Sequence, residues 1–154
     1  MRRVGVLAVL GLAFGGCGAS GKPPASLDEV LGRFRAAFEE ARVEPIEDLF
    51  PGGWAISSFA GETRRSATGA ELRRRLEQLF RDRVPVSYRE RPRSILSSAD
   101  DSYVLFAPEW TSMEIGTDRL VVESFRIGIE RGLAGGGALP GARWRIREFT
   151  VWTR

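Results

Sequence analysis

The sequence predicts an α+β fold in which helices from the first half of the chain pack on one face of an antiparallel sheet from the second half. Two segments of the first half repeat apolar residues at helical spacing, and each begins with a capping-box pattern. Four strand-like segments follow Pro85, separated by short polar or glycine-rich turns. Consecutive strands with short turns favour an antiparallel meander.

The N-terminus, residues 1–16, is typical of a bacterial signal peptide. Arg2 and Arg3 precede an apolar stretch over 4–14 that is too short to span a bilayer. Phe14-Gly15-Gly16-Cys17 then resembles a lipobox, which implies that Cys17 carries lipid such as palmitate and becomes the mature N-terminus. The alternative is an ordinary secretory signal that ends near a free cysteine.

Residues 17–25 are rich in glycine, serine and proline, which predicts a flexible tether between the lipid and a domain over 26–154. The lipobox therefore implies a protein anchored in the bacterial cell envelope. Gly18, rather than an aspartate, follows the cysteine, which favours the periplasmic face of the outer membrane over the inner membrane.

Composition excludes several kinds of chemistry. The 154-residue chain contains no histidine and one cysteine, which removes Ser-His-Asp catalysis, histidine-ligated metals and internal disulfides. The net charge is +3, and loss of Arg2 and Arg3 with the signal leaves about +1. We therefore expect no nucleic-acid partner, no metal and no cofactor.

The helices are predicted from local patterns. Ser26 and Glu29 form a capping box, and apolar residues at helical spacing then predict a helix over 27–43. Pro45 begins a short helix that ends at 51–53, and a strand follows over 54–60. Thr68 and Glu71 form the second capping box, which opens a helix that ends before Pro85.

The strands are predicted over 86–97, 102–113, 119–131 and 143–153. Pro92 and Pro108 remove backbone donors, so they mark bulges, strand ends or edges. The glycine run 135–137 predicts a mobile loop, and it differs from a phosphate-binding loop because a strand follows it.

This order resembles the SnoaL-like branch of the nuclear transport factor 2-like superfamily over roughly 27–154. The likeness lies in the first helix leading to 46–50, the strand from Trp54, the helix opening at 69–72, and the ending 143–152. It implies a cone-shaped, strongly curved antiparallel sheet around the N-terminal helices, a cystatin-like roll with a cavity at its wide end. Members of this family include isomerases, cyclases, dehydratases and hydrolases, and many others only bind ligands or partners.

Alternation along the strands gives candidate pocket residues. The last strand is predicted to place Trp144, Ile146, Glu148, Thr150 and Trp152 on one face. Phe125 and Trp110 occupy alternating apolar rows of the preceding strands. A bulge at Pro108 would exchange the faces, so either set could line the cavity. The candidate pocket residues are Trp110, Phe125, Trp144 and Trp152.

In the steroid isomerases of the family that this chain resembles, an aspartate acts as the base and a tyrosine donates a hydrogen bond to the developing oxyanion. No strand interior here carries an aspartate, and the strand acids are Glu109, Glu123, Glu130 and Glu148. Candidate catalytic residues are Glu109, Glu148, Tyr88 and Tyr103, because a glutamate in an apolar pocket could serve as a base. The alternative for Glu148 is a strand residue paired with a neighbouring arginine.

Two functions remain open from the sequence. The first is a lipid-anchored protein that binds a small apolar ligand or a partner protein without catalysis, with a homodimer as one form of partnership. The second is an isomerase- or hydrolase-like enzyme that uses a pocket carboxylate and a tyrosine. The missing histidines favour the first.

Overall fold

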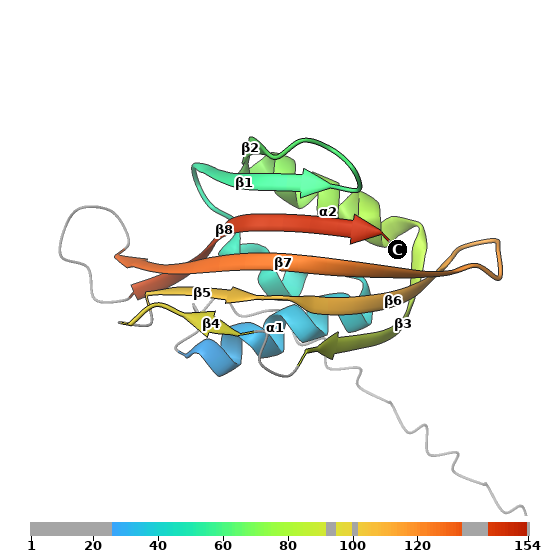
Figure 1. Ribbon diagram of the computed structural model, residues 1–154, viewed down its shortest axis with the longest axis horizontal. Coiled ribbons are helices and arrows are strands. Elements are labelled where there is room, and N and C mark those ends of the chain that lie inside the picture. Colours follow the sequence, from blue (N-terminus) through green and yellow to red (C-terminus); the bar gives the residue numbers. More distant parts are fainter. Residues whose placement is uncertain (1–25, 92–94, 100–101, 134–141, 154) are drawn as a thin grey trace, which may run out of the picture.

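The computed structural model describes residues 26–91, 95–99, 102–133 and 142–153. Helices lie behind one face of a curved sheet, as Figure 1 shows. The helical elements are α1 (Leu27–Glu40), the 3-10 helix η1 (Glu44–Leu49) and α2 (Gly69–Arg81). The strands are β1 (Trp54–Phe59), β2 (Arg65–Thr68), β3 (Arg83–Glu90), β4 (Leu96–Ser97), β5 (Tyr103–Phe106), β6 (Pro108–Glu114), β7 (Leu120–Leu133) and β8 (Ala142–Thr153). The signal peptide, Cys17, the tether and the loop 135–137 lie outside the described residues.

Both predicted helix starts are confirmed, and each depends on a side-chain cap. The Ser26 hydroxyl accepts a hydrogen bond from the backbone N–H of Glu29, and the Thr68 hydroxyl accepts one from that of Glu71. The first helix is shorter than the predicted 27–43, because Ala41 adopts a left-handed conformation with φ of 50° and closes the helix at Glu40.

The sheet is built around the long strand β7. Strand β8 pairs with β7 along one edge, while β6 and β5 share the other edge. Beyond β8 lies β1, which runs parallel to it, and then β2. Strand β3 pairs with β6. The predicted antiparallel meander is confirmed: the segment 86–97 pairs with 102–113 through β3–β6 and β4–β5, the segment 102–113 pairs with β7, and β7 pairs with β8. Strand β2 was not predicted.

Two of the predicted strands are each divided into two. The segment 86–97 forms β3 and, separately, β4, and the segment 102–113 forms β5 and β6. Pro108 is the first residue of β6, in agreement with its predicted place at a strand end. The division lets both β5 and β6 pair with one strand, which bends the sheet around the helices.

A β-bulge in β8 corrects the predicted face pattern. Gly128 pairs with Glu148 and Ile129 pairs with Ile146, so Arg147 is an extra residue on β8. The alternation reverses there: Trp144 and Ile146 face the helices, as do Phe149 and Val151. The predicted single face for 144, 146, 148, 150 and 152 is wrong, because its last three members lie on the other side.

Aromatic rings fill the space between the helices and the sheet. The ring of Phe38 on α1 lies 4.7–5.7 Å, centroid to centroid, from four other rings. These four rings belong to Phe80, Tyr88, Trp110 and Phe125. Phe125 continues the contacts to Phe149, and Phe149 stacks on Phe59 of β1. The inner face, defined as the sheet face toward the helices, is thus largely packed.

Candidate functional site

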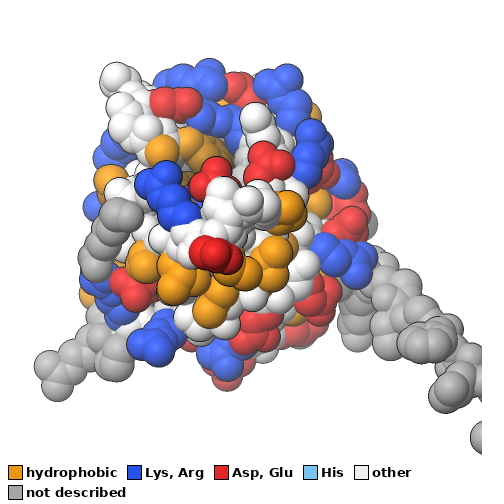
Figure 2. Space-filling view, turned by 90° about the vertical axis from the view of Figure 1, so that its right-hand side faces the viewer, with side chains coloured by type: hydrophobic (Ala, Val, Ile, Leu, Met, Phe, Trp, Pro, Cys, Tyr) orange, Lys and Arg blue, Asp and Glu red, His pale blue; other side chains and the backbone are white. Residues whose placement is uncertain are grey.

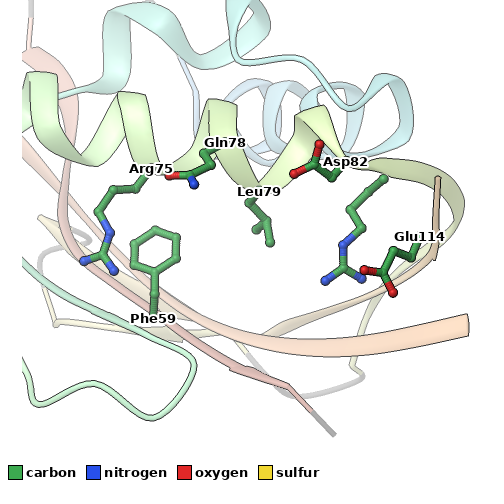
Figure 3. A pocket seen from close by; sticks show the side chains of 7 residues that line it. Phe59, Arg75, Gln78, Leu79, Asp82 and Glu114 are labelled. Carbon is green, nitrogen blue, oxygen red and sulfur yellow. The ribbon is translucent and has the colours of Figure 1, made fainter. Parts of the chain in front are cut away.

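A cleft of about 260 Å³ lies between α2 and the inner face of the sheet. Figure 3 shows it with α2 above and the strands below. Its apolar lining comes from Leu79 of α2 and Phe59 of β1. The remaining lining residues are polar or charged: Arg75, Gln78, Asp82, Arg83 and Glu114. Small-molecule sites are usually lined mainly by apolar side chains with a few polar groups, and this cleft has a larger polar share.

One end of the cleft is closed by an arginine stacked on an aromatic ring. The guanidinium carbon of Arg75 lies 4.1 Å from the centroid of the Phe59 ring. Arg75 also donates from Nη2 to a carboxylate oxygen of Glu62 at 2.5 Å. Its Nη1 is buried and has no acceptor among the described residues. This end is held in place by the cation–π contact and the ion pair.

Behind the other end of the cleft, Arg83 contacts a buried acid that the sequence analysis did not select as a candidate. Arg83 donates from Nη2 to Oε1 of Glu123 at 3.4 Å and from Nη1 to Oγ of Ser112 at 3.5 Å. Glu123 is 2% exposed, and its Oε2 has no partner among the described residues. Burial raises the pKa of Glu123, and the Arg83 charge opposes that rise.

Glu123 could have been found from strand parity. It lies two residues before Phe125, in the inward row that continues through Ile127 and Ile129. A glutamate in an otherwise apolar row is a stronger signal of a buried acid than a glutamate on the polar row. The sequence gives no comparable indication that Arg83 and Leu79 line the cleft. Leu79 lies on α2 and Arg83 follows it at the start of β3, so their places depend on how α2 packs against the sheet.

The four predicted pocket residues fall into two places. Trp110 and Phe125 are 0% and 1% exposed in the aromatic core, and Trp144 is also buried there. None of these three lines the cleft. Trp152 is 46% exposed and lies on the outer face, because the bulge at Arg147 reverses its direction.

Glu148 and Tyr103 come together, but on the outer face. An oxygen of Glu148 lies 3.0 Å from Arg64 and 3.2 Å from Arg126. The hydroxyl of Tyr103 packs over Gly128, where a Cβ would lie 2.2 Å from it. Burial, and then the charge of Glu148, raise the pKa of Tyr103. This arrangement agrees with the arginine-paired alternative for Glu148.

The other two candidate catalytic residues are separated from the cleft. Glu109 pairs with Arg91 at 2.9 Å. Tyr88 stacks on Phe38 in the core, with 5.4 Å between ring centroids, and burial raises the pKa of its hydroxyl. Neither residue lines the cleft, so no predicted carboxylate–tyrosine pair faces it.

Within the residues that the structure describes, no three carboxylate or thiol side chains are grouped as a metal site would require. None of the described helices is long and apolar enough to cross a bilayer.

Figure 2 looks at the end of the molecule beside the β6–β7 turn, where hydrophobic side chains gather among charged ones. Ile115 and Leu120 are exposed hydrophobic residues at this turn, and Val84 is another on the adjacent strand β3.

Solved structures of several bacterial proteins share this fold. A proposed isomerase from Bacillus subtilis is 18% identical with a TM-score of 0.57, over 82% of this chain and 85% of that one. A nuclear transport factor 2-like protein from Cytophaga hutchinsonii is 9% identical with a TM-score of 0.54, over 82% and 97%. An LEH-like epoxide hydrolase of M. tuberculosis is 13% identical with a TM-score of 0.51, over 80% and 79%.

These likenesses show a nuclear transport factor 2-like fold: mixed α+β, with a strongly curved and unclosed sheet. No protein-family model and no curated protein sequence matches the chain. The identities support the fold and not a shared activity.

Proposed function

We propose that this protein is a lipid-anchored binding protein of the bacterial cell envelope, with a SnoaL-like domain that holds a small molecule without catalysis. The observation that carries the proposal is the cleft of about 260 Å³, with Phe59 and Leu79 as its apolar surface and charged groups at both ends. A volume below the usual 300–1,000 Å³ favours a ligand smaller than a drug molecule.

The acids outside the cleft support binding over catalysis. Glu109 pairs with Arg91, and Glu148 lies within ion-pair distance of Arg64 and Arg126, so the arginines already engage both carboxylates. The aromatic core leaves the cone interior filled around Trp110. A ligand is therefore expected at the cleft rather than deep inside the cone.

Binding is tested with the full chain in lipid nanodiscs, with empty nanodiscs as the blank. Benzyl alcohol serves as a neutral aromatic probe, and protein amide resonances are followed by NMR during its titration. We expect saturable shifts that are lost in Leu79→Gln and kept in Val86→Gln, which alters an apolar side chain that is 55% exposed outside the cleft. Equal responses from the two variants would contradict a ligand site at the cleft.

Anchoring at Cys17 is tested separately. Labelled palmitate is expected to enter the wild-type protein in bacteria and not the Cys17→Ala variant, and only the wild type should remain in the outer-membrane fraction. Equal labelling of the two proteins would reject the lipoprotein proposal and leave the cleft proposal standing.

A second candidate function depends on Glu123. A buried carboxylate with a raised pKa beside an arginine of the cleft has the character of a general base. An isomerase- or hydrolase-like reaction would use it, and the proposed isomerase and the epoxide hydrolase share the fold. Hydrolysis of styrene oxide by the wild type, abolished in Glu123→Gln, would favour this candidate; no turnover would favour binding alone.

We also propose that the outer face pairs with a second copy of the chain. Trp152 and Trp54 are exposed there at 46% and 60%, on the neighbouring strands β8 and β1. Burying large aromatic side chains is a common source of association energy. Sedimentation should show a dimer that dissociates in Trp152→Glu, and a monomeric wild type at high concentration would reject the pairing.

A further inference from the structure

The charged end of the cleft contains groups of both signs. Asp82 caps the end of α2, Arg83 begins β3, and Glu114 ends β6 directly opposite Arg83 in the β3–β6 register. Figure 3 shows the side chains of Asp82 and Glu114 at one end of the cleft, and Arg83 also lines it. Among the described residues, neither Asp82 nor Glu114 has an ion-pair partner within 4.0 Å.

Arg83 keeps donors for a ligand. A guanidinium carries five N–H groups, and the two hydrogen bonds of Arg83, to Ser112 and Glu123, measure 3.5 and 3.4 Å. Both are longer than the usual charge-assisted bond of about 2.7–2.9 Å. Glu123 holds Arg83 from behind, and its second oxygen is buried without a partner. The guanidinium is therefore positioned but incompletely satisfied.

The rest of the cleft is suited to an apolar group. Leu79 lies between the charged end and Phe59, as Figure 3 shows, and the stacked Arg75 closes the far end. The cleft thus offers an acceptor pair and a donor at one end, followed by an apolar surface of limited length. A ligand with charge at one end and a short apolar body matches this layout.

We propose that the cleft binds a small zwitterion with an apolar side chain, the chemical class of free apolar α-amino acids. The ligand carboxylate accepts from Arg83, its ammonium group donates to Asp82 and Glu114, and its side chain covers Leu79 and Phe59. This inference rests on the proposed binding function and specifies its ligand.

Ligands that carry a single charge, positive or negative, fit the charged end of the cleft less well than a zwitterion does. An anion would meet Asp82 and Glu114 as well as Arg83, and a cation would meet Arg83 as well as the two acids. A zwitterion pairs each of these charges with its opposite. Because a hydrogen bond to a charged group is worth about 1.5–3 kcal/mol, removing either ligand charge should weaken binding roughly tenfold or more.

The test compares three ligands that share one side chain: L-phenylalanine, N-acetyl-L-phenylalanine and L-phenylalanine amide. The first is a zwitterion, the second an anion, and the third a cation below the pKa of its amine. Each is titrated into the full chain in nanodiscs at pH 6.5, with NMR shifts of the amide resonances as the readout. We expect L-phenylalanine to bind at least roughly tenfold more tightly than either analogue.

Variants locate the two charge contacts. Glu114→Gln should weaken the binding of L-phenylalanine and of its amide, while the affinity for the N-acetyl compound should stay the same or increase. The paired variant Arg83→Gln/Glu123→Gln removes both members of the buried ion pair together. It should weaken the binding of L-phenylalanine and of the N-acetyl compound. Arg74→Gln is the control, because Arg74 is an exposed residue of α2 outside the cleft.

The outcomes separate the ligand class from the proposed function. Equal affinities for the three ligands, or tighter binding of either analogue, would overturn the zwitterion assignment. If benzyl alcohol binds at Leu79 while L-phenylalanine binds no better, the cleft remains a binding site and only the ligand class is wrong. If neither binds, both proposals fail. If the paired variant does not fold, Glu114→Gln alone still decides the ammonium contact.

Discussion

Replacing Trp110 with alanine tests whether this residue belongs to the core or to a ligand pocket. Trp110 is fully buried and makes edge contacts with Phe38 and Phe80, at centroid distances of 5.7 and 5.4 Å. Truncating a buried tryptophan costs about 3–5 kcal/mol. Its indole nitrogen has no partner among the described residues, and removing an unsatisfied group returns part of that cost.

The expected loss for Trp110→Ala is therefore about 3 kcal/mol, a large share of the roughly 5–15 kcal/mol that stabilises a typical domain. The control is Leu96→Ala, a truncation at a residue that is 63% exposed, for which we expect a loss of less than about 1 kcal/mol. Urea unfolding of the full chain in a mild detergent, followed by circular dichroism, measures both. The core assignment would be refuted if Trp110→Ala kept wild-type stability but lost benzyl alcohol binding.

The remaining predictions concern buried or crowded positions. Burial raises the pKa of Glu123 above its ordinary 4.5, so protonated Glu123 contributes to the unfolding free energy below that pH. This contribution should be lost as the pH rises through the pKa of the folded state. Urea titrations between pH 4 and 8 should show the loss in the wild type and not in Glu123→Gln. Gly69→Ala would place a Cβ 1.9 Å from the carbonyl oxygen of Pro51, so we expect about 1–3 kcal/mol of destabilisation or more, measured by thermal melting. Gly128→Ala meets the movable hydroxyl of Tyr103 instead, so a double-mutant cycle with Tyr103→Ala should show coupling of about 0.5–3 kcal/mol, whereas additive effects would contradict the contact.

The helices were predictable because their signals are local. The caps at Ser26 and Thr68 and the apolar spacing that follows each of them lie within one segment of chain, and the structure uses both caps. The end of α1 was harder to predict, because it depends on Ala41 adopting a left-handed conformation that alanine rarely takes. Helix starts are thus encoded more strongly here than helix ends.

The strand pairing depends on distant parts of the chain. Strand β3 pairs with β6, as the predicted meander of 86–97 with 102–113 implies, whereas β1 lies parallel to β8, almost a hundred residues away. No local pattern near Trp54 specifies β8 as its partner. The cleft has the same origin, because Phe59, Leu79 and Glu114 meet only after β1, α2 and β6 have assembled.

The single extra residue Arg147 decides which glutamate could take part in chemistry. With unbroken alternation from Trp144, Glu148 would face the helices and be a natural catalytic candidate. The bulge instead directs Phe149 and Val151 inward and leaves Glu148 on the outer face between two arginines. Strand β7 keeps its alternation from Val121 to Ile127, so its inward acid, Glu123, is the one buried beside the cleft. Because a one-residue shift reverses every later side chain, parity is reliable only in a strand without a bulge.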